Sequence, residues 1–176
     1  MSERRHDAIG RAALTLFASD GYERTSVDAI AAEAGVSKRT VYSHYGDKEN
    51  LFLSVVRDTY DRMLARIAEI VERTVWDTDV PLALTGCVTE ITRSIVRAPE
   101  RATLSRLLLT EAPHFPALID LLHDRTVTPI IAAPLARLGR AGLLAIGDPG
   151  EAAEHLAALT FEQVNARSLM GTVPLS

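Results

Sequence analysis

The sequence predicts an all-α protein in which a short N-terminal helix-turn-helix unit precedes a longer helical bundle. Three observations predict this fold. Ala, Leu and Arg are the commonest of the 176 residues, and all three favour helices. Apolar residues recur at steps of three and four, whereas the alternating runs typical of strands are absent. Glycine, proline and small polar residues stand where one helical pattern ends and the next begins.

Caps and helix breakers set the bounds of the predicted helices. Gly21 ends the first helix, because glycine readily adopts the left-handed cap conformation. Thr25 is the expected N-cap of the second helix, and Ser37 and Asp47 are the expected N-caps of the third and fourth. The helices expected from these patterns cover about 3–20, 27–34, 38–45, 48–74, 80–97, 99–111, 116–140 and 149–171.

Prolines add detail to the C-terminal helices. Pro99 and Pro149 fit the first turn of their helices, where a missing N–H has no cost. Pro129 and Pro134 lie inside the segment 116–140, where a proline removes a helical hydrogen bond. We therefore expect this segment to be kinked or split.

Composition limits the class of protein. Apolar residues make up 47% and charged residues 24% of the chain, which excludes disorder as the main state. No apolar run approaches the ~20 residues of a transmembrane helix, and no signal-peptide pattern is present. We expect a cytoplasmic protein with no membrane partner. The single cysteine, Cys87, excludes an intrachain disulfide and a cysteine-based zinc cluster.

The third helix has the composition of a nucleic-acid contact. The net charge of −4 argues against general coating by nucleic acid, but no acidic residue lies between Ala34 and Gly46. With Val41 facing the core, the other faces of 38–45 carry hydrogen-bond donors, which phosphates and guanine edges require. Lys48 opposes the dipole of the next helix, and a bound phosphate would compensate. The alternative is a solvated helix in a generic bundle.

A longer motif around this helix resembles a known family. The segment TSVDAIAAEAGVSKRTVYSHYGDKENLF, residues 25–52, is similar to the DNA-binding head of the tetracycline-repressor (TetR) family, whose usual pattern is IA..AGVS..T.Y.HF..KE.L. The leading helix also fits, so that the resemblance covers about residues 4–56. Two positions depart from the pattern: Tyr45 replaces the usual Phe, and Arg39 replaces Gly or Pro.

The resemblance implies residue roles and a domain division. Lys38, Arg39 and Thr40 would approach bases, while Tyr42, His44 and Lys48 would mainly hold phosphates of a palindromic double-stranded operator. The implied domains are a helix-turn-helix DNA-binding domain over 1–47 and a ligand-binding and dimerisation domain over 48–176, with the helix 48–74 shared between them. The predicted DNA-contacting residues are Thr25, Ser26, Ser37, Lys38, Arg39, Thr40, Tyr42, His44 and Lys48.

The remaining residues are implied to sense a ligand and to form a homodimer. The segments 116–140 and 149–171 are candidates for the dimer interface, with intrachain core as the alternative for their apolar residues. A small-molecule effector of unknown identity would release a repressor from DNA, and an activator of the same fold stays open. The shortlist for the effector pocket is Tyr60, Met63, Leu64, Trp76, Cys87, Phe115 and His123.

Two other functions have weaker support in the sequence: an enzyme and a metal sensor. Cys87 has no activating motif beside it, and no GxSxG or P-loop pattern occurs, so we expect no catalytic site, no enzyme activity and no cofactor. Glu111 with His114, and Asp120 with His123, have the carboxylate-x-x-His spacing of bundle metal sites. The two pairs lie on different predicted segments, so no metal ligand is assigned. A metal-responsive helical sensor remains the alternative.

Overall fold

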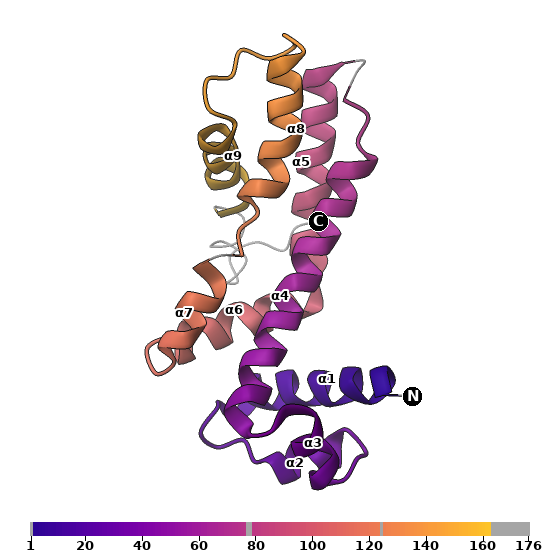
Figure 1. Ribbon diagram of the computed structural model, residues 1–176, viewed down its shortest axis with the longest axis vertical. Coiled ribbons are helices and arrows are strands. Elements are labelled where there is room, and N and C mark those ends of the chain that lie inside the picture. Colours follow the sequence, from indigo (N-terminus) through magenta and orange to yellow (C-terminus); the bar gives the residue numbers. More distant parts are fainter. Residues whose placement is uncertain (1, 77–78, 124, 163–176) are drawn as a thin grey trace. The chain divides into compact units, whose positions relative to one another are not determined.

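The computed structural model describes residues 2–76, 79–123 and 125–162, and this part of the chain is helical with no strand (Figure 1). The prediction of an all-α fold is confirmed. The helices are α1 (Ser2–Asp20), α2 (Val27–Glu33), α3 (Lys38–Tyr45), α4 (Lys48–Arg73), α5 (Val80–Arg97), α6 (Pro99–Glu111), α7 (Pro116–His123), α8 (Thr128–Arg140) and α9 (Pro149–Ala157), followed by a π-helical turn (Ala158–Glu162).

The segment 116–140 contains two helices rather than one. The break precedes Pro129, which occupies the first turn of α8, where its missing N–H leaves no bond unmade. Pro134 lies inside α8 and is buried, and the helix continues through it. The expectation of a split is therefore met at the first proline but not at the second. The last predicted helix is helical from Pro149 onward, and its end beyond residue 162 lies outside the described residues.

One predicted cap is wrong. Ser26, not Thr25, caps α2: its backbone is extended, and its side-chain oxygen accepts a hydrogen bond from the Ala29 amide. The Thr25 side chain turns inward instead, and its hydroxyl donates to the carbonyl oxygens of Leu16 and Gly21 at 3.1 and 2.8 Å. The Thr25 hydroxyl therefore bonds to the end of α1 and does not cap the N-terminus of α2.

Contacts divide the chain into two compact units: residues 1–61 with 99–124, and residues 62–98 with 125–176. The first unit therefore contains α1 to α3, the first part of α4, and α6 and α7. The second contains the rest of α4 with α5, α8 and α9. This division by packing differs from the functional boundary predicted at residue 48, which stays a prediction.

The first unit has an aromatic centre. Phe17 and Phe52, both fully buried, meet edge to face with ring centroids 5.1 Å apart. Tyr22 stacks on Phe17, and Phe115, which precedes α7, lies 4.4 Å from the Tyr22 ring and 5.1 Å from Phe52. Such ring pairs add to the burial of apolar area. They connect α1, α4 and the α6–α7 corner.

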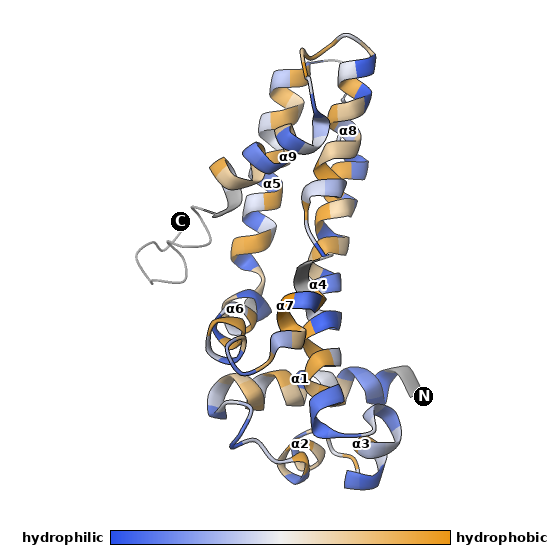
Figure 2. Ribbon diagram, turned by 60° about the vertical axis from the view of Figure 1, so that its left-hand side comes forward, coloured by the Kyte–Doolittle hydropathy of each residue, from blue (hydrophilic) through white to orange (hydrophobic). Residues whose placement is uncertain are grey.

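The second unit has an aliphatic core. Each of its helices has a hydrophobic and a hydrophilic side (Figure 2), and the buried sides meet in one cluster. The cluster lines a narrow apolar cavity of about 10 Å³, about the least space that admits one water molecule. Its buried members are Ile67, Ile70, Val71, Cys87, Ile91, Ile131, Leu135 and Ala153.

Candidate nucleic-acid interface

The helix-turn-helix is built on local sequence signals. Gly35, at φ +66°, makes the turn after α2, and the Val36 amide closes it by donating to the Ala31 carbonyl at 2.9 Å. Val41 and Tyr45 are buried at 1% and 8% exposure and attach α3 to the rest of the first unit. One side of α3 is thus committed to packing, and the other side is left for solvent or a ligand.

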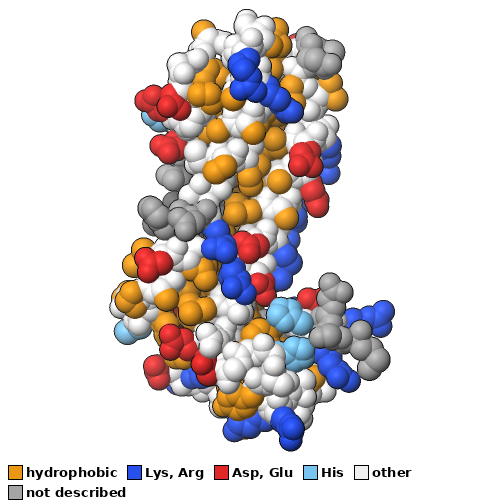
Figure 3. All heavy atoms as spheres, viewed as in Figure 1, with side chains coloured by type: hydrophobic (Ala, Val, Ile, Leu, Met, Phe, Trp, Pro, Cys, Tyr) orange, Lys and Arg blue, Asp and Glu red, His pale blue; other side chains and the backbone are white. Residues whose placement is uncertain are grey.

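The free side of α3 presents donors. Around the helix, Lys and Arg side chains lie on the surface (Figure 3), and Tyr42 is 42% exposed although it is aromatic. The side chains of this surface are exposed or half-buried, as a DNA contact requires. They are Ser37, Lys38, Arg39, Thr40, Tyr42, Ser43 and His44.

Lys38 is held by an acidic neighbour on the supporting helix. Its ammonium donates to the Asp28 carboxylate at 2.8 Å, and both side chains are exposed. This hydrogen bond raises the pKa of Lys38, so the side chain remains a cation. Asp28 follows the N-cap position of α2 by two residues, and it makes an ion pair with the helix that carries the donors.

Lys48 is placed at the N-terminus of α4 by two neutral groups. Its ammonium lies 4.3 Å from the centroid of the Tyr22 ring and 3.3 Å from the carbonyl oxygen of Glu23. A cation over an aromatic face is attracted without being neutralised. Lys48 therefore keeps its charge at the start of α4, where the Asn50 amide donates to the capping Asp47 carboxylate at 2.7 Å.

The hydroxyl residues predicted as DNA contacts differ in accessibility. Thr25 is only 3% exposed and its hydroxyl donates within the chain, so the structure does not support a DNA contact by its side chain. Ser26 and Ser37 are exposed. Both use an oxygen lone pair to cap a helix, and the Ser26 hydroxyl proton is not used by that cap.

Sequence reasoning missed a polar group that supports α3. His6 on α1 contacts the hydroxyl of Tyr45 at 3.0 Å and the carboxylate of Asp58 at 3.1 Å. His6 and Asp58 are 52 residues apart, so no spacing in the sequence connects them. The nearest sequence signal is Tyr45 itself, where the family pattern has a phenylalanine.

The pocket shortlist is not gathered in one place. Trp76 and Cys87 do line the narrow cavity of the second unit, where burial raises the pKa of the Cys87 thiol. Phe115 packs instead against Tyr22 in the first unit, because the aromatic centre there takes up its ring.

Three further shortlisted residues, Tyr60, Met63 and Leu64, do not line the narrow cavity of the second unit. Met63 and Leu64 are half-buried on α4. Tyr60 is half-buried on the same helix, and burial raises the pKa of its phenol. The His123 side chain lies outside the described residues. The effector pocket therefore stays a prediction.

The structure also bears on the metal alternative. The Glu111 carboxylate accepts a hydrogen bond from the Tyr22 amide at 3.1 Å, which is a structural use of that side chain. Within residues 2–76, 79–123 and 125–162, no group of three or more His, Cys, Asp or Glu side chains could hold a metal ion. In the same ranges, no helix is both long and apolar enough to cross a membrane.

Comparison with known proteins reveals two matching family models. A model of the tetR family of bacterial regulatory proteins matches residues 9–55. A model of the AefR-like transcriptional repressor C-terminal domain matches residues 83–175, which is more than half of the chain. Together they span both the helix-turn-helix and the C-terminal helices.

Curated relatives match over part of the chain. The HTH-type transcriptional regulator HbdR of Aromatoleum sp. (strain CIB) is 43% identical over 72 residues, 39% of this chain and 31% of that protein. The HTH-type transcriptional repressor AcnR of Corynebacterium glutamicum is 35% identical over 85 residues, 48% of this chain and 37% of that protein. The chain thus spans about a third of the length of these relatives.

Solved structures match over the whole chain. A TetR-family transcriptional regulator from Mesorhizobium loti MAFF303099 has a TM-score of 0.89 at 28% identity, covering 100% of this chain and 89% of that one. The flavonoid-responsive regulator FrrA has a TM-score of 0.69 at 27% identity, covering 99% and 88%. These relatives are regulators rather than enzymes, and the chain belongs to the TetR family of bacterial transcriptional regulators, with an AefR-like C-terminal domain.

Proposed function

We propose that the protein binds a palindromic double-stranded DNA operator as a homodimer and represses transcription until a small-molecule effector releases it. The observation that carries this proposal is the surface of α3, which is anchored by Val41 and Tyr45 and presents donors without an acidic residue among them. Donors on a short exposed helix match the major groove, where guanine offers two acceptors. DNA binding would place the protein in the cytoplasm, where bacterial DNA lies.

The exposed residues divide by the DNA group that they reach. Lys38, Arg39 and Thr40, in the first turn of α3, are assigned to base edges, because the N-terminal residues of a recognition helix contact bases. Tyr42, His44, Lys48, Ser26 and Ser37 are assigned to phosphates, which fix the register of the protein on the duplex. Thr25 is left out of this set because its hydroxyl donates within the chain.

A homodimer would supply the second head that a palindrome requires. Two half-sites about 34 Å apart are read by two recognition helices related by a two-fold axis. In the second unit, an open groove of about 610 Å³ follows α8 and the end of α4, and small side chains such as Ala68, Ala133 and Ala136 line it. Small residues permit close approach of another helix, and we assign this face to the dimer interface.

The apolar residues of the two candidate interface segments, 116–140 and 149–171, divide between the core and the surface. Leu118 and Leu135 are buried within their own units at 0% and 4% exposure, as intrachain core. Leu159 is 72% exposed and remains available to a partner. The interface is therefore assigned to the outer face of α8 and the segment after α9.

The effector is assigned to the apolar interior of the second unit. The cavity lined by Trp76, Cys87 and Val71 carries no charged side chain, but it has room for no more than one water molecule. An effector would therefore bind a conformation in which these helices have moved apart. Binding to one tilt of α4 would shift the population toward it and change the DNA affinity of the heads.

The test is selection of bound duplexes from a random pool, followed by fluorescence anisotropy on the selected palindrome and on a scrambled duplex of equal length. We expect the palindrome to bind at least ~10³-fold more tightly than the scrambled duplex at the same salt concentration. Equal affinity for the two duplexes overturns the proposal.

Two variants then separate the assigned roles. Lys48→Ala should weaken binding to both duplexes alike and reduce the salt slope by about 1, whereas Arg39→Ala should change the preferred sequence. A uniform loss in Arg39→Ala would contradict its assignment to bases. Transcription from a promoter that carries the selected palindrome distinguishes a repressor from an activator.

A further inference from the structure

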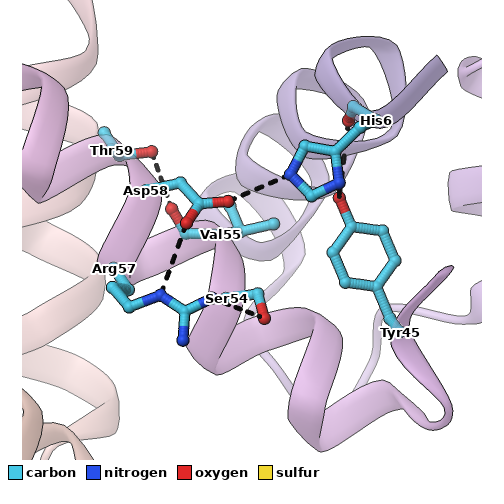
Figure 4. Close-up of polar contacts among 7 residues, drawn as sticks. All are labelled: His6, Tyr45, Ser54, Val55, Arg57, Asp58 and Thr59. Atoms are coloured by element: carbon cyan, nitrogen blue, oxygen red, sulfur yellow. Dashed lines mark hydrogen bonds and ion pairs between the residues drawn. The ribbon is translucent and has the colours of Figure 1, made fainter. Parts of the chain in front are cut away.

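Three helices of the first unit meet at one histidine (Figure 4). The Tyr45 hydroxyl, at the last residue of α3, lies 3.0 Å from His6 Nδ1 on α1. His6 Nε2 lies 3.1 Å from Oδ2 of Asp58 on α4. The other carboxylate oxygen, Oδ1, accepts from Arg57 Nε at 3.4 Å. A continuous chain of polar contacts thus runs from α4 through α1 to the end of α3.

The chemistry of the partners assigns the protons in this chain. A carboxylate only accepts, so His6 Nε2 carries the proton that is shared with Asp58. In the tautomer with its proton on Nε2, Nδ1 accepts from the Tyr45 hydroxyl, which also donates to the His6 backbone carbonyl oxygen at 3.4 Å. Burial, with Asp58 and Asp7 nearby, raises the pKa of Tyr45 to about 12, so the phenol keeps its proton. Donor and acceptor match at both nitrogens of the ring.

Packing holds the same ring in place. The His6 and Tyr45 rings stack with centroids 5.2 Å apart and an interplanar angle of 24°. The His6 ring also meets His44 edge to face at 6.4 Å. His44 is exposed and Tyr45 is 8% exposed, so His6 contacts both the outer and the inner side of the last turn of α3.

The contact between Tyr45 and His6 lies at the C-terminal end of α3, where it can hold the orientation of the helix. Ser37 caps the first turn and Val41 is buried in the middle, which fixes the axis at one end and at the centre. At the C-terminal end of α3, the hydrogen bond between the Tyr45 hydroxyl and His6 attaches the helix to α1. A recognition helix must hold several donors in register with base edges, and small misplacements weaken all of them.

From this geometry we infer that His6 is a positioning residue for DNA binding: held by Asp58, it fixes the C-terminal end of α3 through the Tyr45 hydroxyl. This inference rests on the proposed binding of DNA by α3. It assigns to His6 no contact with DNA. Asp58 orients the imidazole and selects the tautomer that accepts from Tyr45.

The test is a double-mutant cycle with variants that keep the rings. Tyr45→Phe removes only the hydroxyl, and His6→Phe keeps an aromatic ring but removes both nitrogens. Each is expected to weaken binding to the selected palindrome about five- to tenfold, the size of one lost hydrogen bond. The double variant should be no weaker than either single variant, because both changes break the same contact. The salt slope should stay unchanged, since no phosphate contact is removed.

Matched variants separate positioning from folding. Thr85→Val removes a hydroxyl that bonds within α5, to the Pro81 carbonyl oxygen at 2.8 Å, and should bind the palindrome like the wild type. Asp58→Asn is a second route to the same loss, for use if His6→Phe does not fold. Thermal unfolding and far-ultraviolet circular dichroism verify that each variant is folded. Wild-type affinity in Tyr45→Phe, or additive losses in the cycle, would overturn the inference.

A measurement without DNA keeps the inference separate from the proposed function. Hydrogen exchange at the amides of Ser43, His44 and Tyr45 should be about five- to tenfold faster in Tyr45→Phe and His6→Phe than in the wild type. If the wild type prefers no duplex, the proposed function fails, and the exchange rates alone then test whether His6 fixes the end of α3. Unchanged exchange in the last turn of α3 overturns the role of His6.

Discussion

Single side chains at the surface of α3 are already engaged before any DNA is present. Lys38 is paired with Asp28 at 2.8 Å, and this contact must open if the ammonium is to reach a base. The pair is exposed, and exposed pairs contribute little to stability. The pair should affect DNA affinity more than stability, because the Asp28 carboxylate beside the recognition helix repels nearby phosphates.

Replacing Asp28 tests this effect. Asp28→Asn should raise the affinity for both the selected palindrome and the scrambled duplex and steepen the salt slope by about 1, since one more cation is free to displace counterions. Anisotropy titrations at several salt concentrations measure both quantities. Asp20→Asn, at the end of α1, is the matched control for loss of a negative charge. An unchanged salt slope in Asp28→Asn would contradict the role of the pair.

The buried phenol of Tyr45 predicts an alkaline weakness. Its pKa is raised from 10.0 to about 12, so folding disfavours the phenolate. The stability it contributes is complete below pH 10 and is lost as the pH rises through 12. Between pH 8 and pH 11, the unfolding free energy of the wild type should fall about 1.4 kcal/mol more than that of Tyr45→Phe. Urea unfolding at both pH values measures the difference, and equal losses would refute it.

At the scale of helices, the hydroxyl that caps α2 decides how its first turn is held. Ser26 satisfies the Ala29 amide, and Thr25 beside it satisfies two carbonyls at the end of α1. Adjacent hydroxyl residues thus serve two different helices. The family-like motif begins at the buried one, so its first residue acts in packing rather than in recognition.

Removing the Ser26 cap should destabilise the protein through the first turn of α2. Ser26→Ala leaves the Ala29 amide without its partner and should lower the free energy of unfolding by about 1 kcal/mol. Ser26→Asp restores an acceptor at the N-terminus of the helix and should recover the loss. Chemical unfolding of the three proteins measures both effects. If Ser26→Ala is as stable as the wild type, the cap has no role in stability.

Helices α6 and α7 belong to the first unit although they follow α5 in sequence. The Glu111 carboxylate binds the Tyr22 amide, and the Phe115 ring packs on Tyr22 and Phe52. The head is therefore supported by a segment some 90 residues away along the chain. Such contacts are visible only once the chain is folded, because no local pattern connects the two segments.

For the whole molecule, the proposed dimer makes a direct prediction about α8. Ala133 is exposed and lines the groove between α8 and the end of α4. Ala133→Glu would place a large charged side chain where the close approach of the proposed partner needs a small one, and would remove its charge from water. We expect the variant to be monomeric by light scattering and to lose the preference for the palindrome.

A control variant distinguishes the interface from general surface damage. Leu143→Glu places the same charge at a side chain that is 52% exposed in the turn after α8. This variant should dimerise and bind DNA like the wild type. A dimeric Ala133→Glu variant would remove the outer face of α8 from the interface.

Local sequence signals are enough to predict the helices and the donor surface of α3. Periodicity, caps and glycines act over a few residues, so the bounds of α3, α5 and α6 could be predicted to the residue. The absence of acidic residues on α3 is likewise a property of the sequence.

Three features depend instead on packing between distant segments: the hydroxyl that caps α2, the unit that takes up Phe115, and the contacts of His6 with Tyr45 and Asp58. Each of these depends on groups that are far apart in the chain, and a choice between near-equal local options, such as Thr25 and Ser26, is made by packing against another helix. Contacts over 39 and 52 residues leave no periodic trace in a single sequence. The positions of the donors are therefore local information, and the support that orients them is not.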